Sequence, residues 1–419
     1  MLFRRLSIRF LYLLFFLFLS SCISVSTPFR SIVNPYSERP PNQPAFSYSI
    51  VHEDEKFSTL YFNFDSSLLS FKKNESDSLF RSVYRIVCHL QKRISNRRDA
   101  DSVVFLFKSN FRSVVPPRIQ DKCKIKLAQG SKYFLELIVQ DALSGNKKII
   151  TGKIDKTNDL VSDNYYLTLD TLISSPISVA HVGNSLFFRN NRLPLQKSYD
   201  VAHYPFSTSL ASPPFDTEEN KPNSTFPDTS FRLTTQNNFF YLQPTKNGIY
   251  ICRTNMDASD ALKIPILKAE AILLPTFRYL TTIVEFDSLM MNQDKMASEK
   301  TFWLKCNGDQ NRAVVLMSEW KRRVEISNYY FTSDREGWRT DRGMIYLLFG
   351  PPAQLNFTLS AETWIFHDGL FFEFKRRENS LSDNDFVLER KQEFSTIWYG
   401  AVDTWRQGRI NYGTKLKSK

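Results

Sequence analysis

The stretch that decides the fold of the C-terminal third of the chain is Gly337-Trp338-Arg339-Thr340-Asp341-Arg342-Gly343, followed by Met344-Ile345-Tyr346-Leu347-Leu348-Phe349 and Gly350-Pro351-Pro352. We expect Gly337 to take a positive φ where a helix ends, and Trp338 to anchor a hydrophobic core. The apolar run 344–349 predicts a strand. The turn 350–352 should end that strand rigidly, because proline has no backbone N–H to donate.

The polar residues of this stretch have a structural and a functional interpretation. Thr340 or Asp341 can cap or bond turn amides before the strand. Arg342 can pair with Asp341 or with a carboxylate such as Glu362. In the structural interpretation, these residues and Gly343 form a folding element. We favour this interpretation because glycine and capping residues recur at such turns. In the alternative, Asp341, Arg342 and Glu362 line a binding or catalytic cleft.

The segments on either side predict a compact α+β module over residues 291–410, followed by a basic tail at 411–419. The apolar residues over 311–331 fall on one helical stripe, and a dipeptide typical of tight turns separates the apolar segments 362–367 and 370–374. The expected elements are a helix over 311–331, a hairpin of strands 362–367 and 370–374 that contains Trp364, and a helix over 395–406.

This region resembles the GWxTD domain, which is found mainly in envelope lipoproteins of Bacteroidetes and related bacteria. The resemblance covers roughly residues 300–405, and Phe349 stands where the family usually has tyrosine. It implies a fold and an envelope location, but no established biochemical activity. The residues that carry it, besides the stretch quoted above, are Phe302-Trp303, Arg322-Arg323-Val324 and Glu362-Thr363-Trp364.

The chain begins with a pattern typical of a bacterial lipoprotein signal. Arginines precede an apolar run at 10–19, and Leu19-Ser20-Ser21-Cys22 fits a lipobox. The run is too short to span a bilayer, so we expect a signal peptide at 1–21 and lipidation of Cys22. No aspartate or acidic cluster follows Cys22, which favours the periplasmic face of the outer membrane over the cell surface. The prolines of the next segment predict a flexible tether over 22–44.

Residues 45–290 predict two β-rich domains that precede the α+β module. Alternating apolar residues over 45–160 predict an antiparallel, immunoglobulin-like β-sandwich. Within it, the run 103–107 is typical of a buried strand, whereas the period of 81–93 fits either a strand or a helix. Residues 161–290 predict a second β-rich domain, with a strand at 281–286 and a long, mobile polar loop at about 205–228.

Composition and motifs exclude several classes of function. The formal net charge is +12, but the basic residues are scattered and the expected compartment holds no nucleic acid. The five histidines show no metal-binding spacing, and no nucleophile or phosphate-loop motif occurs, so we expect no metal, cofactor or catalytic residue. Four cysteines besides Cys22 could form disulfides or remain buried thiols: Cys88, Cys123, Cys252 and Cys306.

These features predict a non-enzymatic outer-membrane lipoprotein that acts as an interaction or scaffolding component of an envelope complex. Its expected partners are the membrane, through Cys22, and another envelope protein. One alternative is a glycan- or ligand-binding lipoprotein that uses exposed aromatic residues such as Trp364 or Tyr399. A less favoured alternative is an envelope enzyme that uses the cleft described above. The oligomeric state stays open.

Overall fold

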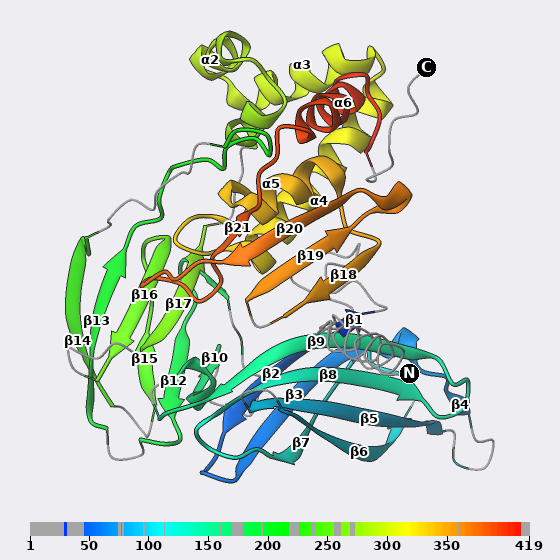
Figure 1. Cartoon of the computed structure of the whole chain (residues 1–419), viewed down its shortest axis with the longest axis vertical. Helices are drawn as coiled ribbons and strands as arrows, with labels where there is room; N and C mark the ends of the chain where they lie inside the picture. The colour runs from blue at the N-terminus through cyan, green and yellow to red at the C-terminus, as the bar shows by residue number, and fades with distance from the viewer. Residues whose placement is uncertain are drawn as a thin grey trace, which may run out of the picture.

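The computed structural model consists of three domains, which Figure 1 shows as a lower sandwich, a second sandwich on the left and a mixed domain above. This strand-rich architecture with a C-terminal module of helices and strands confirms the predicted fold class. Among the described residues, no helix has both the length and the apolar character needed to cross a membrane. The predicted signal peptide, Cys22 and residues 412–419 of the basic tail lie outside the described residues. The structure describes 29–31 and 46–411, apart from 74–76, 78, 95–96, 113, 160, 170–176, 178, 194–195, 218–225, 236–238, 255–260, 269–272 and 359.

The first domain is a β-sandwich in which buried and exposed residues alternate along the strands. Leu60, Phe62 and Phe64 are fully buried in the same core as Leu135 and Leu137 of the facing sheet. One sheet contains β2 (Phe46–His52), β3 (Phe57–Asp65) and β7 (Arg118–Lys126). The other contains β4 (Lys72–Lys73), β5 (Leu79–Ile94), β6 (Arg97–Arg112), β8 (Ser131–Asp141) and β9 (Lys147–Lys156).

Strands β5 and β6 settle two points in this sandwich. Residues 81–93 are strand, because they lie within β5 and pair along it with β6. The expectation that the run 103–107 is buried is wrong, since Val104 and Leu106 are 57% and 61% exposed. Among the described residues β6 pairs only with β5, so it is an edge strand. The face of β6 that carries Val104 and Leu106 meets solvent.

The second domain is a smaller pair of sheets with its own buried core. The polar loop predicted at 205–228 is not mobile over its described N-terminal half, because it is bonded to the third domain. The amide of Ser207 donates to the carbonyl of Asp334 over 2.9 Å, and that of Ala211 to the carbonyl of Arg339 over 2.9 Å. One sheet contains β10 (Tyr165–Thr168), β12 (Leu186–Asn190) and β15 (Phe240–Leu242). The other contains β11 (Ala180–His181), β17 (Leu262–Leu267), β16 (Gly248–Arg253), β13 (Ser198–Tyr204) and β14 (Thr229–Thr234).

The third domain packs helices against a five-stranded sheet around one core. Apart from Ala211, which comes from the loop at 205–217, the buried residues of this core begin at Leu273, so the domain starts earlier than the predicted boundary at 290. Its helices are α2 (Ile283–Met291), α3 (Lys295–Asn307), α4 (Gln310–Phe331), α5 (Asp341–Phe349) and α6 (Phe394–Arg406). Its sheet runs β1 (Phe29–Ser31), β18 (Gln354–Phe357), β19 (Ala361–Ile365), β20 (Phe371–Arg376) and β21 (Phe386–Leu388). In the described part of the chain, short 3₁₀ helices are Ser66–Leu68, Ser162–Asn164, Leu274–Tyr279, Gly337–Arg339 and His367–Gly369.

The predicted helices α4 and α6 and the hairpin of β19 and β20 are confirmed, but two predicted strands are helices. The segment 281–286 begins α2, where the Thr282 hydroxyl accepts from the amide of Glu285 over 3.2 Å. The run 344–349 belongs to α5, where the Thr340 hydroxyl accepts from the amide of Gly343 over 3.1 Å. In both cases an N-cap starts a helix whose apolar residues resemble a buried strand.

The predicted tether is structured where it is described. Residues 29–31 form β1, which pairs antiparallel with β18 and brings Arg30 opposite Asn356. The prediction of a flexible tether is therefore wrong for these three residues. The segment instead completes one edge of the C-terminal sheet, which removes an exposed row of backbone groups.

The four cysteines that follow Cys22 are free thiols. Cys88 and Cys123 are buried in the same sandwich core, one on each sheet, while Cys252 and Cys306 belong to the other two domains. The neighbouring Cys88 side chain and burial raise the pKa of Cys123. Among these four residues, only Cys88 and Cys123 share a core and could be joined within the native fold.

We expect diamide, added while the unfolded protein refolds, to join Cys88 and Cys123, because refolding brings together two thiols that burial shields in the native state. Each thiol loses one hydrogen to the oxidant, so the intact mass should fall by two hydrogen atoms. Mass spectrometry of the oxidised protein checks this, with the disulfide located by peptide mapping. The Cys88→Ser variant should show no such loss, whereas Cys252→Ser should behave like the wild type. A disulfide that persists in Cys88→Ser would contradict the prediction.

Candidate functional site

The two glycines at the ends of the GWRTDRG stretch allow three segments to touch backbone to backbone. A Cβ added at Gly337 would lie 1.8 Å from the carbonyl oxygen of Ser327 in α4. A Cβ added at Gly343 would lie 1.9 Å from the carbonyl oxygen of Gly337. The expected positive φ at Gly337 is wrong, because this residue is not among the described glycines with that conformation. Its role is to permit a close approach between α4 and the turn before α5.

Trp338 and Trp364 are core residues. Trp338 is 1% exposed, and its amide donates to the Asn328 side chain over 3.2 Å. Trp364 is 0% exposed, and its indole donates to Glu362 over 3.2 Å. Because Trp364 is buried, it cannot offer the exposed aromatic surface that the glycan-binding alternative requires. The other four tryptophans are also buried. Tyr399, in contrast, is 58% exposed.

Thr340 and the turn 350–352 mark the two ends of α5. The Thr340 hydroxyl caps the helix as described above and donates to the carbonyl of Gly337 over 2.7 Å. Gly350 ends the helix with a φ of 74°, and its amide donates to the carbonyl of Tyr346 over 2.8 Å. Pro351 and Pro352 follow directly, so this turn terminates a helix and not the expected strand.

Asp341 is bound by a partner that the sequence did not indicate. One carboxylate oxygen lies 2.7 Å from a guanidinium nitrogen of Arg390, and both side chains are largely buried. The amide of Leu388 in β21 also donates to Asp341, over 2.7 Å. Arg390 donates further to the carbonyl of Ser212 over 3.1 Å. Asp341 therefore joins α5, β21 and the loop from the second domain.

Arg342 forms a separate ion pair with Glu362, which was one of the two partners that the sequence suggested for it. Its Nη1 lies 3.0 Å from Glu362 of β19, with side-chain exposures of 3% and 11%. Its Nη2 donates to the carbonyl and side-chain oxygens of Asn384, and the guanidinium lies 4.2 Å from the ring centroid of Phe386. Asp341 and Arg342 thus point into different pairs. The cleft in which Asp341, Arg342 and Glu362 would converge is not formed.

Arg323 is a central residue to which the sequence assigned no role. It is fully buried in α4, and its Nε donates to Glu319 over 2.8 Å. Its two terminal nitrogens donate to the carbonyls of Leu347 and Asn411 over 3.0 and 2.6 Å. Burial lowers the pKa of Arg323, against the effect of Glu319. Arg323 thus ties α4 to the last turn of α5 through Leu347 and to the segment after α6 through Asn411, which indicates a structural role.

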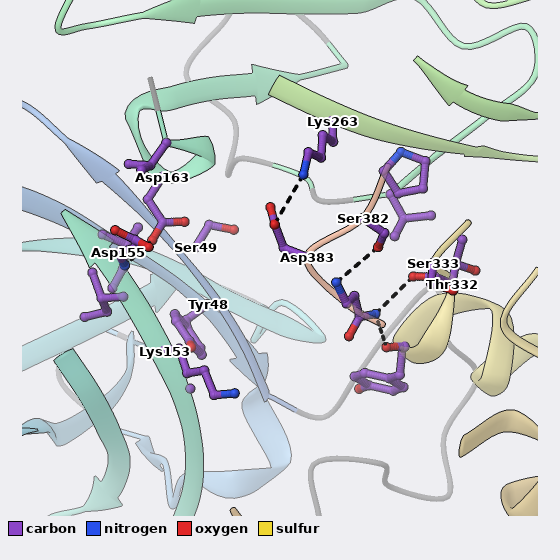
Figure 2. Close-up of a pocket in the computed structure, with 18 of the residues that line it drawn as sticks. Tyr48, Ser49, Lys153, Asp155, Asp163, Lys263, Thr332, Ser333, Ser382 and Asp383 are labelled. Carbon is purple, nitrogen blue, oxygen red and sulfur yellow. Dashed lines mark hydrogen bonds and ion pairs between the residues drawn. The ribbon is translucent and has the colours of Figure 1, made fainter. Parts of the chain in front are cut away.

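A cavity of about 840 Å³ lies where the three domains meet. Strands β2 and β9 form one wall, β17 forms the second, and the end of α4 with the loop before β21 forms the third. The ion pair of Arg342 and Glu362 belongs to this last wall. Figure 2 shows Lys153 extending from β9 toward the open space, with Asp155 and Asp163 on the same side.

The ionisable groups of this cavity are perturbed. Burial raises the pKa of Asp163 to about 7, although the Asp155 amide donates to it over 2.9 Å. Burial also lowers the pKa of Lys153 to about 8. Burial opposes ionisation of Asp155 too, but its hydrogen bonds outweigh burial, and Lys132, at 2.7 Å, is among the partners that lower its pKa. Perturbed groups in a cavity of this size are typical of binding sites.

The cavity also carries a contact between the second and third domains. Lys263 of β17 lies 3.3 Å from Asp383 in the loop before β21, as the dashed line in Figure 2 shows. Asn384 holds the same loop by donating to the carbonyls of Tyr330 and Thr332 over 2.9 and 3.1 Å. Among the described residues, no group of three or more histidine, cysteine or acidic side chains could hold a metal ion.

Comparisons with known proteins give one family. A family model described as the GWxTD domain matches residues 250–407. Curated proteins give no match. Among solved structures, Bacteroides uniformis beta-glucuronidase 2, covalently bound to cyclophellitol-6-carboxylate aziridine, aligns at 6% identity and a TM-score of 0.16, over 35% of this chain and 17% of that one. Red sea bream transglutaminase aligns at 8% identity and a TM-score of 0.16, over 54% of this chain and 31% of that one. The chain thus spans less than a third of either protein, and at these TM-scores the two similarities indicate neither a shared fold nor a shared function.

Proposed function

We propose that this protein, a member of the GWxTD domain-containing family, is a lipid-anchored, non-enzymatic interaction component of an envelope complex on the periplasmic face of the outer membrane. The observation that carries the proposal is the free edge of β6. Support also comes from the GWRTD residues, whose polar groups are engaged in capping bonds and ion pairs within the fold. Because those groups serve the architecture, we place the partner-binding surface on β6.

The edge of β6 has the properties of a strand-addition site. Among the described residues it pairs on one side only, and it is sixteen residues long. Val104 and Leu106 expose apolar side chains on its outer face, while Phe105 packs against the core and holds the strand in place. Unpaired strand edges with apolar side chains bind extended segments of other chains through backbone hydrogen bonds.

Charge indicates the kind of segment that fits. Lys108 and Arg112 are exposed on β6, and Arg85 is exposed on β5 opposite Leu106. Asp101 is an exposed acidic residue on the same strand. The excess of positive charge favours an acidic, extended segment with apolar residues at alternate positions. We propose that another envelope protein supplies it.

The membrane anchor is proposed at Cys22. Phe29, the first residue of β1, is seven residues beyond Cys22. A fully extended chain covers about 3.5 Å per residue, or roughly 25 Å over this distance. Because β1 pairs with β18, lipidation of Cys22 would hold the C-terminal domain close to the membrane, although it is remote from Cys22 in sequence.

We expect Cys22→Ser to release the protein from the membrane. Stable anchoring needs at least two acyl signals, and the variant would have no attachment point for them. Cell fractionation and incorporation of labelled palmitate measure both effects, with Ser24→Ala as a control that should remain anchored. A Cys22→Ser protein that still carries label in the membrane fraction would refute the anchor.

Copurification tests the interaction proposal. The full-length protein is crosslinked gently in cells, extracted from solubilised outer membrane and purified, and the bound proteins are identified by mass spectrometry. We expect a stoichiometric envelope protein, absent when the Cys22→Ser variant is used. Recovery of free monomer alone would overturn the proposal.

A further inference from the structure

The cavity between the three domains has the dimensions and position of a ligand site. Its volume of about 840 Å³ falls within the range of about 300–1,000 Å³ typical of small-molecule sites, which often lie between domains. The second and third domains are joined beside it by Lys263 and Asp383. The loop before β21 is held in place by Asn384. The walls are therefore positioned by contacts that do not depend on a ligand.

The charges that line the cavity favour an anion. Of the described residues, five cationic side chains and four acidic ones contribute to its walls. One of the acids, Asp163, is partly neutral near pH 7. Burial and the nearby charges of Arg376, Arg342 and Lys132 disfavour the ammonium of Lys153, while Glu362 favours it. The cations are Lys132, Lys153, Lys263, Arg342 and Arg376, and the acids are Asp155, Asp163, Glu362 and Asp383.

The neutral part of the lining adds hydroxyl and apolar groups. Tyr48, Thr157 and Ser382 bring hydroxyl groups to the cavity, and Phe46 and Leu167 add apolar surface. Such a mixture suits a ligand with its own hydroxyl groups and a carbon skeleton.

We propose that this cavity binds a small, hydroxyl-bearing molecule with a carboxylate or phosphate group, and that Lys153 contacts that anionic group. Lys153 is suited to this role by its place on the rigid strand β9, where its ammonium points into the open space (Figure 2). Its ammonium lies 5.2 Å from the ring centroid of Phe386, which places the side chain next to the third domain. An anion placed there would offset the surrounding positive charge.

Calorimetric titration of the full-length protein tests the proposal with three probes. Gluconate supplies a carboxylate, glucose 6-phosphate supplies a phosphate, and glucose is the neutral control. We expect at least one of the two anions to bind and glucose not to bind. The anion that binds more tightly identifies the source of the negative charge. Failure of both anions to bind would overturn the proposal.

Two variants separate binding at Lys153 from general attraction by a basic protein. Lys153→Met removes the ammonium and keeps the aliphatic stem, and we expect at least tenfold weaker binding of the anion. Lys147→Met changes an exposed lysine on the same strand and should leave binding unchanged. Equal binding by Lys153→Met and the wild type, with unchanged melting temperatures, would place the anion elsewhere and refute the assignment.

Binding should also weaken as the pH rises from 7 to 9. Lys153 loses its proton around pH 8, and at pH 9 about a tenth of the molecules would keep the positive charge. Asp163 gains negative charge around pH 7, which acts in the same direction. The charged groups that face Lys153 come from four elements: Lys132 of β8, Arg342 of α5, Glu362 of β19 and Arg376 of β20. We expect a roughly tenfold loss of affinity, and an affinity that rises with pH would contradict the role of Lys153.

Discussion

Replacement of Trp338 by alanine should lower the free energy of unfolding of the C-terminal domain by about 3–5 kcal/mol. The side chain is 1% exposed and lies in the core shared by the helices and the sheet. Its ring packs at 6.3 Å from that of Tyr279 and at 4.1 Å from the guanidinium of Arg339. Removal would leave a cavity between rigid segments, since Gly337 holds the preceding backbone against α4.

Denaturant unfolding monitored by circular dichroism measures this loss. Trp338→Phe keeps most of the apolar volume and should cost clearly less, and Tyr399→Ala should change little because Tyr399 is exposed. If Trp338→Ala lost less than about 1 kcal/mol, Trp338 would not be the core anchor described here.

Replacement of Glu362 by leucine should cost a similar amount, about 3–5 kcal/mol. Glu362 lies within hydrogen-bond distance of Arg342 and Trp364 in a largely buried site. Without the carboxylate, the charge of Arg342 would remain buried next to Phe386 and would have no acidic partner in this pair. An uncompensated buried charge is more costly than the loss of the pair as a whole.

A double variant distinguishes this effect from loss of packing. Arg342→Met combined with Glu362→Leu removes both charges, so we expect it to unfold with a free energy closer to the wild type than Glu362→Leu alone. The coupling between the two sites should be at least about 1 kcal/mol in a double-mutant cycle. Strictly additive losses would show that the two side chains do not interact in the native protein.

The sequence predicted helix α4 well because its apolar stripe has an unambiguous period. Leu316, Trp320 and Val324 are all buried as expected. It failed at α5, where the residues after Gly343 are apolar on every side because the helix is buried on every side. A short apolar run of this kind has no period that separates a helix from a strand, and the N-cap at Thr340 was the available signal.

The candidate site was harder to predict than the elements. The pair of Arg342 and Glu362 was one of the two pairings expected for Arg342, the other being with Asp341, and both residues belong to one domain. The partner of Asp341 was missed, since Arg390 follows a strand whose pairing depends on the whole sheet. The cavity was missed entirely, because Lys153, Asp163 and Lys263 come together only when separate domains pack. No local pattern in the chain encodes that arrangement.

The contacts of the GWRTD stretch engage its side chains within the fold. Its glycines and tryptophan shape the core, and its charged residues join elements within and between domains. A stretch used in this way is a structural element that holds the loop of the second domain against the third domain. We infer that the edge of β6 in the first domain, which pairs with no other described strand, is the surface that meets a partner.

The most direct test of the central claim compares partner capture by two matched double variants after crosslinking in cells. Val104→Lys with Leu106→Lys places charge on the exposed face of β6, whereas Val284→Lys with Val314→Lys places the same charge on exposed positions of α2 and α4. We expect the β6 variant to lose the copurifying envelope protein and the helix variant to keep it. Equal capture by both variants would contradict the claim that this strand edge is the interaction site.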